Sequence, residues 1–254
     1  MARAAGAVTL AGAAGLAAGA ATALGVLHAG PAVTSWRFLR MRLLPSLAGV
    51  GCPDHVALTF DDGPDPKSTP AFLDALQKLG WRATFFLLGS MSRQAPGLAA
   101  ELVAAGHEVA VHGDYHDSML GRTPRAARDD IQRGRDEVAG AAGVEPRWFR
   151  PPYGILSASS IRAAREFGLQ PVLWTAWGRD WRAEATPQTV ASDVRRGLTP
   201  GGTVLLHDSD CTSAPGSWRS ALGALPLLAD VFADRGLAVG PLAEHGIAPP
   251  RAQT

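Results

Sequence analysis

The chain has few cysteines and no excess of charge of either sign. Two cysteines, Cys52 and Cys211, among 254 residues are too few for a disulfide framework or a zinc site built from thiolates. The net charge is +1, and the sequence contains no basic run, which argues against a nucleic acid or a strongly anionic partner. We therefore expect a substrate without net charge. A chain of this length buries enough apolar surface to fold without disulfides.

The N-terminal stretch lacks charged residues altogether. None lies between Arg3 and Arg37, and the residues from Ala4 to Ala32 are mostly Ala, Gly, Leu and Val. A helix of this length crosses a bilayer. The same stretch has the form of a secretory signal, with a small-x-small site at Ala21-Thr22-Ala23. Residues 1–35 are thus predicted to be a signal peptide or a membrane anchor, with a flexible leader as the remaining alternative.

Three arginines complicate the orientation of this segment. Arg37, Arg40 and Arg42 follow it, and positive charge favours the cytoplasmic side. A large soluble domain behind a signal-like N-terminus is usually translocated, so we expect an exported or membrane-anchored protein at the cell surface. The predicted parts of the chain are a signal peptide or anchor (1–35), a linker (36–53), a catalytic domain (54–243) and a C-terminal tail (244–254).

From His55 onward the sequence repeats a short apolar run, a polar loop and a helix. The run from Val56 to Phe60 predicts a buried strand, and a helix is expected from Thr69 to Leu79, with Thr69 as its N-cap and Gly80 at its end. Further strands are expected at Ala83–Leu88, Glu108–Val111, Trp148–Arg150, Pro171–Thr175, Thr203–His207 and Leu237–Val239. Further helices are expected after Leu88 and up to about Ala105, from Thr123 to about Gly143, from Ser157, from Thr186, and from roughly Ser217 to Asp234.

About seven β/α units with continuous apolar strands imply a parallel sheet covered by helices. This number is slightly short of eight, so the predicted fold is α/β, a distorted and incomplete (β/α) barrel. Chemistry in such barrels lies at the carboxyl ends of the strands. The polar residues that follow the predicted strands are Asp61, Asp62, His112, Arg150, Asp180 and His207.

Three of the residues near these strand ends form a metal-ligand set. Asp62, His112 and His116 supply one oxygen and two nitrogens, which is the set of a catalytic zinc with an open position for water. Asp61, next to the ligand Asp62, is then free to act as a base on that water. The sequence therefore predicts a metal-assisted hydrolase.

The same residues lie in five motifs that occur in the order typical of one family. The chain resembles the polysaccharide deacetylases of the NodB-homology type, carbohydrate esterase family 4, over about residues 54–243. The motifs are Thr59-Phe60-Asp61-Asp62-Gly63, His112-Gly113-Asp114-Tyr115-His116, Arg150-Pro151-Pro152-Tyr153-Gly154, Asp180-Trp181 and Val204-Leu205-Leu206-His207. Any one of them alone is a weak signal, but together they are highly specific.

The resemblance implies a role for each residue. Asp62, His112 and His116 would bind a divalent metal, usually zinc. Asp61 would take a proton from the attacking water, and His207 would protonate the departing sugar amine.

The resemblance also implies supporting residues. Arg150 would pair with the catalytic aspartate and keep it ionised, and Asp180 would orient His207 and hold up its pKa. A backbone N–H near Tyr153 would help to hold the oxyanion. Trp181 and Leu205 would form the apolar wall that takes the acetyl methyl group.

The sequence departs from the family pattern at two positions. Gly113 stands where the second motif usually has Ser or Thr, so a hydroxyl that braces the loop is missing. Trp177 stands where the fourth motif usually begins with aspartate, which bears on substrate preference more than on catalysis. Trp177 is expected either to stack on a sugar ring or to pack against its neighbours. The loop Asp208–Ser217 is long and polar and is expected to shape a subsite.

The expected function is therefore metal-dependent N-deacetylation of a glycan that contains N-acetylglucosamine, such as peptidoglycan or a chitin-like polymer. An O-deacetylase of acetylated xylan, or a hydrolase of a small cyclic amide, would use the same site. A non-catalytic glycan-binding module is disfavoured because binding alone needs neither the base nor the acid. We expect a monomer with unbridged thiols, because Cys52 and Cys211 lie at opposite ends of strands that span about 17 Å.

Overall fold

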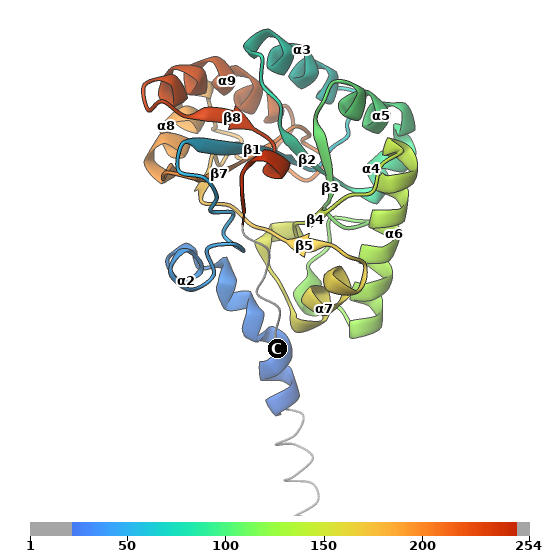
Figure 1. Ribbon diagram of the computed structural model, residues 1–254. Helices are drawn as coiled ribbons and strands as arrows, with labels where there is room; N and C mark the ends of the chain where they lie inside the picture. The colour runs from blue at the N-terminus through green and yellow to red at the C-terminus, as the bar shows by residue number, and fades with distance from the viewer. Residues whose placement is uncertain (1–21, 248–254) are drawn as a thin grey trace, which may run out of the picture.

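The computed structural model describes residues 22–247, in which a parallel sheet curls into a half-barrel with helices on its outer face (Figure 1). The strands are β1 (His55–Asp61), β2 (Thr84–Leu87), β3 (Glu108–Val111), β4 (Trp148–Phe149), β5 (Gln170–Pro171), β6 (Ala176–Trp177), β7 (Thr203–His207) and β8 (Ala238–Gly240). Their order is β5-β4-β3-β2-β1-β7-β6, and β8 pairs with β1. Every pair is parallel. The predicted incomplete (β/α) barrel is confirmed.

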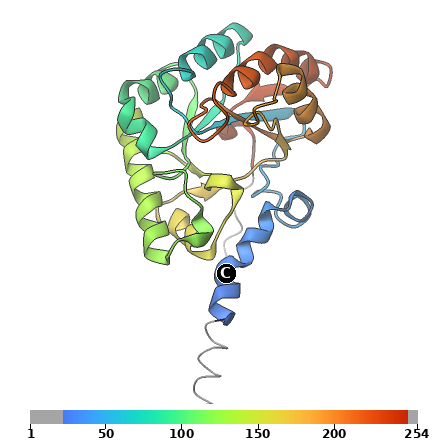
Figure 2. The same ribbon diagram turned by 180° about the vertical axis from the view of Figure 1, so that it is seen from behind.

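Helices cover the sheet from outside, and the view from behind in Figure 2 shows the same layer. They are α3 (Thr69–Leu79), α4 (Gly89–Gln94), α5 (Pro96–Ala104), α6 (Pro124–Ala142), α7 (Ala158–Glu166), α8 (Pro187–Gly197) and α9 (Trp218–Ala233). Helix α2 (Arg37–Leu43) belongs to the N-terminal segment below the half-barrel in Figure 1. Short 3-10 turns are η1 (Gly30–Ser35), η2 (Met119–Gly121), η3 (Pro152–Gly154) and η4 (Leu242–Glu244). Residues 22–29 are also helical.

Local sequence signals set several of the helix boundaries. The hydroxyl of Thr123 accepts a hydrogen bond from the third residue of α6, and Ser157 and Thr186 form capping boxes at the starts of α7 and α8. Gly80 ends α3 in the left-handed conformation. Thr69 is not the N-cap of α3. Its hydroxyl instead accepts a hydrogen bond from the Asp65 N–H at 2.8 Å.

Two predicted elements are divided in the structure. The helix expected from Leu88 to Ala105 breaks into α4 and α5 at Ala95, because the following Pro96 cannot continue the hydrogen-bond ladder. Of the strand expected over Pro171–Thr175, only Pro171 lies in a strand, at the end of β5, and β6 begins after Thr175. Within residues 22–247 no strand pairing joins β5 to β6, so the half-barrel has an open seam there.

The interior is apolar and built on β1, where Val56 to Phe60 are fully buried. The ring of Phe60 stacks on that of Phe85 at 4.9 Å and meets that of Phe72 edge-on at 5.1 Å. Burying each such side chain stabilises the fold by about 1.5–3 kcal/mol. The packed core therefore holds the carboxyl end of β1 rigidly, which is where Asp61 and Asp62 lie.

The segment predicted as a linker lies against the seam of the barrel. Arg37 donates hydrogen bonds to the carbonyls of Thr175 and Gly197, and Thr203 donates one to the Gly49 carbonyl at 2.6 Å. The domain boundaries remain a prediction, but these contacts attach the segment before residue 54 to the barrel. None of the helices within residues 22–247 has the length and apolarity needed to span a bilayer. Most of the predicted span lies outside the described residues.

The residue after Glu244, predicted as part of a tail, is also built into the barrel. His245 is fully buried, its Nδ1 lies 2.8 Å from Nδ1 of His55, and its Nε2 lies 2.9 Å from the Gly201 carbonyl. Because a carbonyl only accepts, Nε2 carries the proton and Nδ1 accepts from His55. Burial, together with His55, lowers the pKa of His245 to about 4.

We expect the free energy of unfolding to fall as the pH drops from about 7 to about 5. His245 titrates at its ordinary 6.5 when unfolded and at about 4 when folded, so the unfolded chain binds the proton first. The loss is on the order of 1–2 kcal/mol from this residue. Urea unfolding at the two pH values measures it. In His245→Gln the side chain cannot titrate, so the free energy of unfolding should depend less on pH. Part of the dependence should remain, because His107 also has a pKa of about 4. An unchanged pH dependence in His245→Gln would contradict the assignment.

Candidate active site

The structure brings the predicted site residues together at the carboxyl ends of the strands. Asp61 on β1 is in register with His207 on β7, so the proposed base and acid come from neighbouring strands. His112 follows β3 directly, and Arg150 follows β4. The sheet therefore gathers side chains that are nearly 150 residues apart in the sequence.

The metal-ligand set converges on one carboxylate oxygen. Oδ1 of Asp62 lies 3.4 Å from Nε2 of His112 and 3.6 Å from Nε2 of His116. Ligand atoms of the three residues all lie within 4.8 Å of one another. The same Asp62 oxygen is buried and has no hydrogen-bond partner among the described residues. A buried carboxylate oxygen without a donor, facing two imidazole nitrogens, fits a divalent cation.

The orientation of His112 is set by its second nitrogen. Nδ1 lies 2.8 Å from the Arg150 carbonyl and must donate to it, which leaves Nε2 with a lone pair directed at Asp62. Burial lowers the pKa of His112 to about 3, although the Asp62 carboxylate acts in the opposite direction. The imidazole is therefore neutral near pH 7, as a metal ligand must be.

Asp61 is held by a buried arginine. Its Oδ1 accepts a hydrogen bond of 2.6 Å from Nη1 of Arg150, and both residues are almost fully buried. Burial raises the pKa of Asp61, and the Arg150 guanidinium opposes that rise. The Arg150 side chain also donates to Thr59 at 2.8 Å and stacks 3.9 Å from the Phe86 ring centroid. This network fixes the carboxylate in one orientation.

His207 is held by Asp180 through two hydrogen bonds. Asp180 accepts from the His207 backbone N–H at 2.7 Å and pairs with Nδ1 of the ring at 3.0 Å. Burial lowers the pKa of His207, but the negative charges of Asp180, Asp62 and Asp61 outweigh it and raise the pKa to about 10. His207 therefore carries a proton near neutral pH, with Nε2 free to donate it.

Exposed aromatic side chains stand at the rim of the site. Tyr153 is 60% exposed and its ring lies 4.5 Å from that of His116, and Trp181 is 42% exposed. Leu205 is buried on β7. Trp177 is half-buried and stacks on Trp181 with ring centroids 6.1 Å apart. Trp177 thus packs behind Trp181 as a support for the exposed indole.

Two site residues have strained backbones. Asp62 has a φ of 80° and Tyr153 a φ of 60°, in a region that side-chain-bearing residues rarely adopt. Such strain costs on the order of 1–3 kcal/mol each and persists only where the surrounding structure imposes it. Both residues lie at the site, since Asp62 belongs to the ligand set and the Tyr153 ring contacts His116.

Gly113, which departs from the family pattern, is explained by its surroundings. It has a φ of 97°, and a Cβ there would lie 2.9 Å from a carboxylate oxygen of Asp130. Asp130 accepts the backbone N–H of Asp114 at 3.2 Å, and Asp114 in turn pairs with Arg93 at 2.7 Å. A carboxylate from α6 therefore braces the loop between the two histidines, in place of the missing hydroxyl.

The sequence analysis missed Thr212 and Asp208. Thr212, in the polar loop after β7, donates a 2.5 Å hydrogen bond to Oδ2 of Asp62 and so orients the carboxylate. Asp208 is fully buried beside Thr69, and burial raises its pKa to about 7. The length and polarity of the loop indicated a functional segment, but no pattern singled out Thr212.

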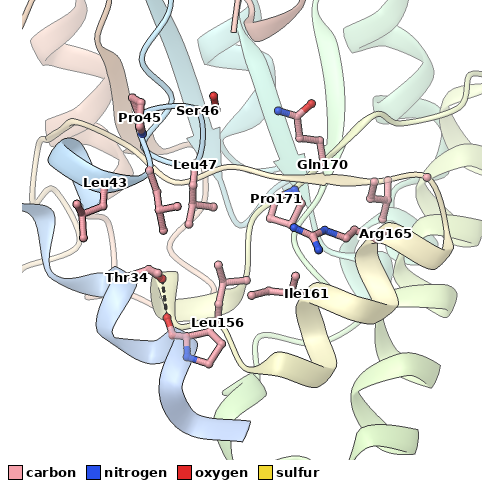
Figure 3. Close-up of a pocket in the computed structure, with 14 residues that line it drawn as sticks. Thr34, Leu43, Pro45, Ser46, Leu47, Leu156, Ile161, Arg165, Gln170 and Pro171 are labelled. Atoms are coloured by element: carbon pink, nitrogen blue, oxygen red, sulfur yellow. Dashed lines mark hydrogen bonds between the residues drawn. The ribbon is translucent and has the colours of Figure 1, made fainter. Parts of the chain in front are cut away.

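A separate groove lies away from these residues. It has a volume of about 1110 Å³ and runs between the N-terminal segment and α7, where Leu43 and Leu47 face Leu156 and Ile161 (Figure 3). None of its lining residues belongs to the cluster around Asp61 and Asp62.

Comparison with known proteins identifies related chains. The polysaccharide deacetylase family model matches residues 49–172. A chitooligosaccharide deacetylase from Bradyrhizobium sp. (strain ANU 289) is 35% identical over 195 residues, which cover 74% of this chain and 88% of that protein. The peptidoglycan-N-acetylglucosamine deacetylase PgdA of Listeria monocytogenes is 36% identical over 160 residues, or 63% of this chain and 34% of the larger protein.

A solved structure shares the fold. The family 4 carbohydrate esterase from Streptomyces lividans, solved in complex with acetate, superimposes with a TM-score of 0.66 at 35% identity. The match covers 74% of this chain and 93% of that structure.

Proposed function

Because the chain belongs to the polysaccharide deacetylase family, we propose that it hydrolyses N-acetyl groups of a glycan containing N-acetylglucosamine, with a divalent metal as cofactor. One observation carries this proposal: Asp61, paired with Arg150, lies beside the ligand set and in register with His207. Amide hydrolysis needs a base and an acid close to the same position, and neighbouring strands bring these two together.

We propose that Asp62, His112 and His116 hold the metal and that it is zinc, which favours two imidazoles and one carboxylate. When bound, such a cation polarises a carbonyl and lowers the pKa of water. Thr212 keeps one Asp62 oxygen occupied, so the other, Oδ1, is the one directed at the histidines.

The proton transfers follow from the two carboxylate-supported residues. Asp61 accepts a proton from the attacking water while the oxygen of that water bonds to the acetamide carbon. His207 then donates its proton to the amide nitrogen as the carbon–nitrogen bond breaks, which releases acetate and a sugar amine. An amine leaves poorly without that proton. Asp180 keeps His207 charged and fixes the direction of its ring.

Two rim residues and the buried Leu205 are proposed to bind substrate. Trp181 and Leu205 would form the apolar wall for the acetyl methyl group, and a backbone N–H near Tyr153 would help to stabilise the oxyanion. The exposed faces of Tyr153 and Trp181 suit stacking on sugar rings. The names of the relatives, a chitooligosaccharide deacetylase and a peptidoglycan-N-acetylglucosamine deacetylase, support an N-acetylated glycan as substrate.

The test is acetate release by the full chain loaded with zinc. The substrates are N-acetylated chitooligosaccharides, peptidoglycan and acetylxylan, with Asp61→Asn as the blank. Release from an N-acetylated glycan above the blank supports the proposal. Release from acetylxylan alone would replace it with O-deacetylation, and no release with zinc shown to be bound would exclude both.

We further propose that the protein acts at the cell surface with its N-terminal segment on the membrane. Eight of the thirteen exposed large hydrophobic side chains of residues 22–247 lie between Leu24 and Leu44, among them Trp36 and Phe38. The sequence has no acidic residue before Asp54, although it has four arginines there. Exposed apolar and aromatic groups combined with positive charge suit an anionic lipid surface.

We expect the double variant Trp36→Gln/Phe38→Gln to bind vesicles of phosphatidylcholine and phosphatidylglycerol at least roughly threefold more weakly than the parent, since two interfacial aromatics are lost. Co-sedimentation of the full chain measures this. The matched control is Leu120→Gln/Val144→Gln, which changes exposed apolar residues elsewhere. Equal vesicle binding by the parent and both variants would contradict the proposal. So would a parent protein that is a dimer without vesicles and becomes a monomer only in Trp36→Gln/Phe38→Gln, because these side chains would then join two copies of the chain.

A further inference from the structure

The connection from β5 to β6, residues 172–175, is only partly paired with neighbouring strands, whereas an ordinary barrel would supply strand partners throughout. The Val172 N–H bonds to Phe149 on β4, and the Thr175 N–H bonds to Thr203 on β7. The N-terminal segment supplies further partners. The bonds run from the Leu173 N–H to the Leu47 carbonyl at 2.7 Å, from Arg40 to the Trp174 carbonyl at 2.7 Å, and from Arg37 to the Thr175 carbonyl at 2.7 Å.

Arg40 is an unusual residue for this position. Its side chain is 2% exposed, yet it has no carboxylate partner among residues 22–247. It donates to the carbonyls of Thr34, Ser35 and Trp174, and its guanidinium lies 5.5 Å from the Trp174 ring centroid. Burial and the charge of Arg150 lower its pKa to about 10, so it stays charged near neutral pH. An apolar side chain would fill the same space without the free-energy cost of burying a charge.

Packing and polar bonds together hold the segment over the seam. Leu47 packs against the buried cluster that includes Leu156, and the groove in Figure 3 lies beside this contact. Arg37 and Arg40 add side-chain hydrogen bonds to the carbonyls of Thr175 and Trp174.

The same connection between β5 and β6 also holds Arg150. The Leu173 carbonyl accepts a 2.9 Å hydrogen bond from Nη2 of Arg150, and the Trp174 ring centroid lies 5.8 Å from its guanidinium. The opposite nitrogen, Nη1, binds Asp61. Arg40 and Arg150 thus bind the carbonyls of adjacent residues, Trp174 and Leu173, and both guanidiniums lie near the Trp174 ring.

We propose that Arg40 is a positioning residue for the deacetylation: it fixes Trp174, and through it the adjoining Leu173 carbonyl, so that these residues hold Arg150 against Asp61. The inference rests on the proposed function, because it takes the Asp61–Arg150 pair as part of the catalytic machinery. It assigns a role in the site to a residue that precedes the matched family model and lies in the predicted linker.

The kinetic test uses the full chain with Arg40→Met and, as matched control, Arg42→Met at an exposed position on the same helix. A misplaced reacting group costs up to about a hundredfold, so we expect kcat to fall roughly 10- to 100-fold in Arg40→Met. KM and zinc affinity should stay within about threefold, because neither the ligands nor the rim is touched. Arg42→Met should match the parent.

A double-variant comparison separates positioning from general destabilisation. In an Arg150→Met background, Arg40→Met should lower kcat no further, since its effect passes through Arg150. A second loss of similar size there would overturn the proposal. So would a kcat for Arg40→Met equal to that of Arg42→Met.

An activity-independent measurement distinguishes this proposal from the proposed function. The NMR signals of the Arg150 guanidinium report how tightly the group is held. They are assigned by their absence from the spectrum of Arg150→Lys. We expect rotation of the guanidinium to accelerate at least roughly tenfold in Arg40→Met and not in Arg42→Met, because the Leu173 carbonyl loses its fixed position. If no form of the protein releases acetate, the proposed function fails, and the Arg150 signal alone then tests whether Arg40 positions Arg150. An unchanged Arg150 signal overturns the positioning role.

Discussion

Asp61→Asn is expected to reduce deacetylation by about 10²- to 10⁴-fold, the range that a positioned general base contributes. Asparagine has nearly the same shape as aspartate but cannot accept the proton of the attacking water. It also leaves the buried Arg150 guanidinium without its carboxylate, so some loss of stability should accompany the kinetic effect.

Zinc affinity separates this role from metal binding. Asp61 is not in the ligand set, so titration of Asp61→Asn with zinc should give an affinity within about tenfold of the parent. Asp74→Asn, an exposed aspartate on α3, is the matched control and should retain full turnover. Near-normal turnover in Asp61→Asn would show that another group is the base.

His112→Ala is expected to lose both metal binding and turnover. Removing one of three ligands from a buried set leaves Asp62 and His116 with too few donors for a tight site, so zinc affinity should fall by at least roughly a hundredfold. Turnover should fall to the level of the chelated parent protein.

Thermal unfolding gives the second measurement for this variant. A ligand that binds only the folded state raises the melting temperature, so zinc should stabilise the parent protein and not His112→Ala. His28→Ala, a histidine outside the site, should respond to zinc as the parent does. A zinc-induced shift of equal size in His112→Ala would mean that the metal binds elsewhere.

Much of the fold was predictable because its signals are local. Apolar runs such as Val56–Phe60 could only be buried strands, and capping residues such as Ser157 and Thr186 marked helix starts within a few residues. Boundaries failed where tertiary contacts decided them. Ala95 and Pro96 divide one predicted helix, and after Pro171 the N-terminal segment supplies part of the pairing that a strand would give, as in the bond from Leu173 to Leu47.

The candidate site shows the same division. The sequence places Asp61, Asp62, His112 and His207 at the ends of strands, and parallel strands must bring such ends to one edge of a sheet. It also shows Gly113 and Trp177 as departures. It does not show that Asp130 braces the loop at Gly113, or that Trp177 supports Trp181.

The sequence by itself determined the type of fold, the residues at the site and the chemistry that they allow, because these depend on strand periodicity and on residue types at strand ends. Only the tertiary structure decided the bond of Thr212 to Asp62 and the attachment of Arg40 to the seam beside Arg150. These contacts join residues more than 100 positions apart, and the curvature of the sheet sets their distances. No local pattern in the chain encodes that curvature.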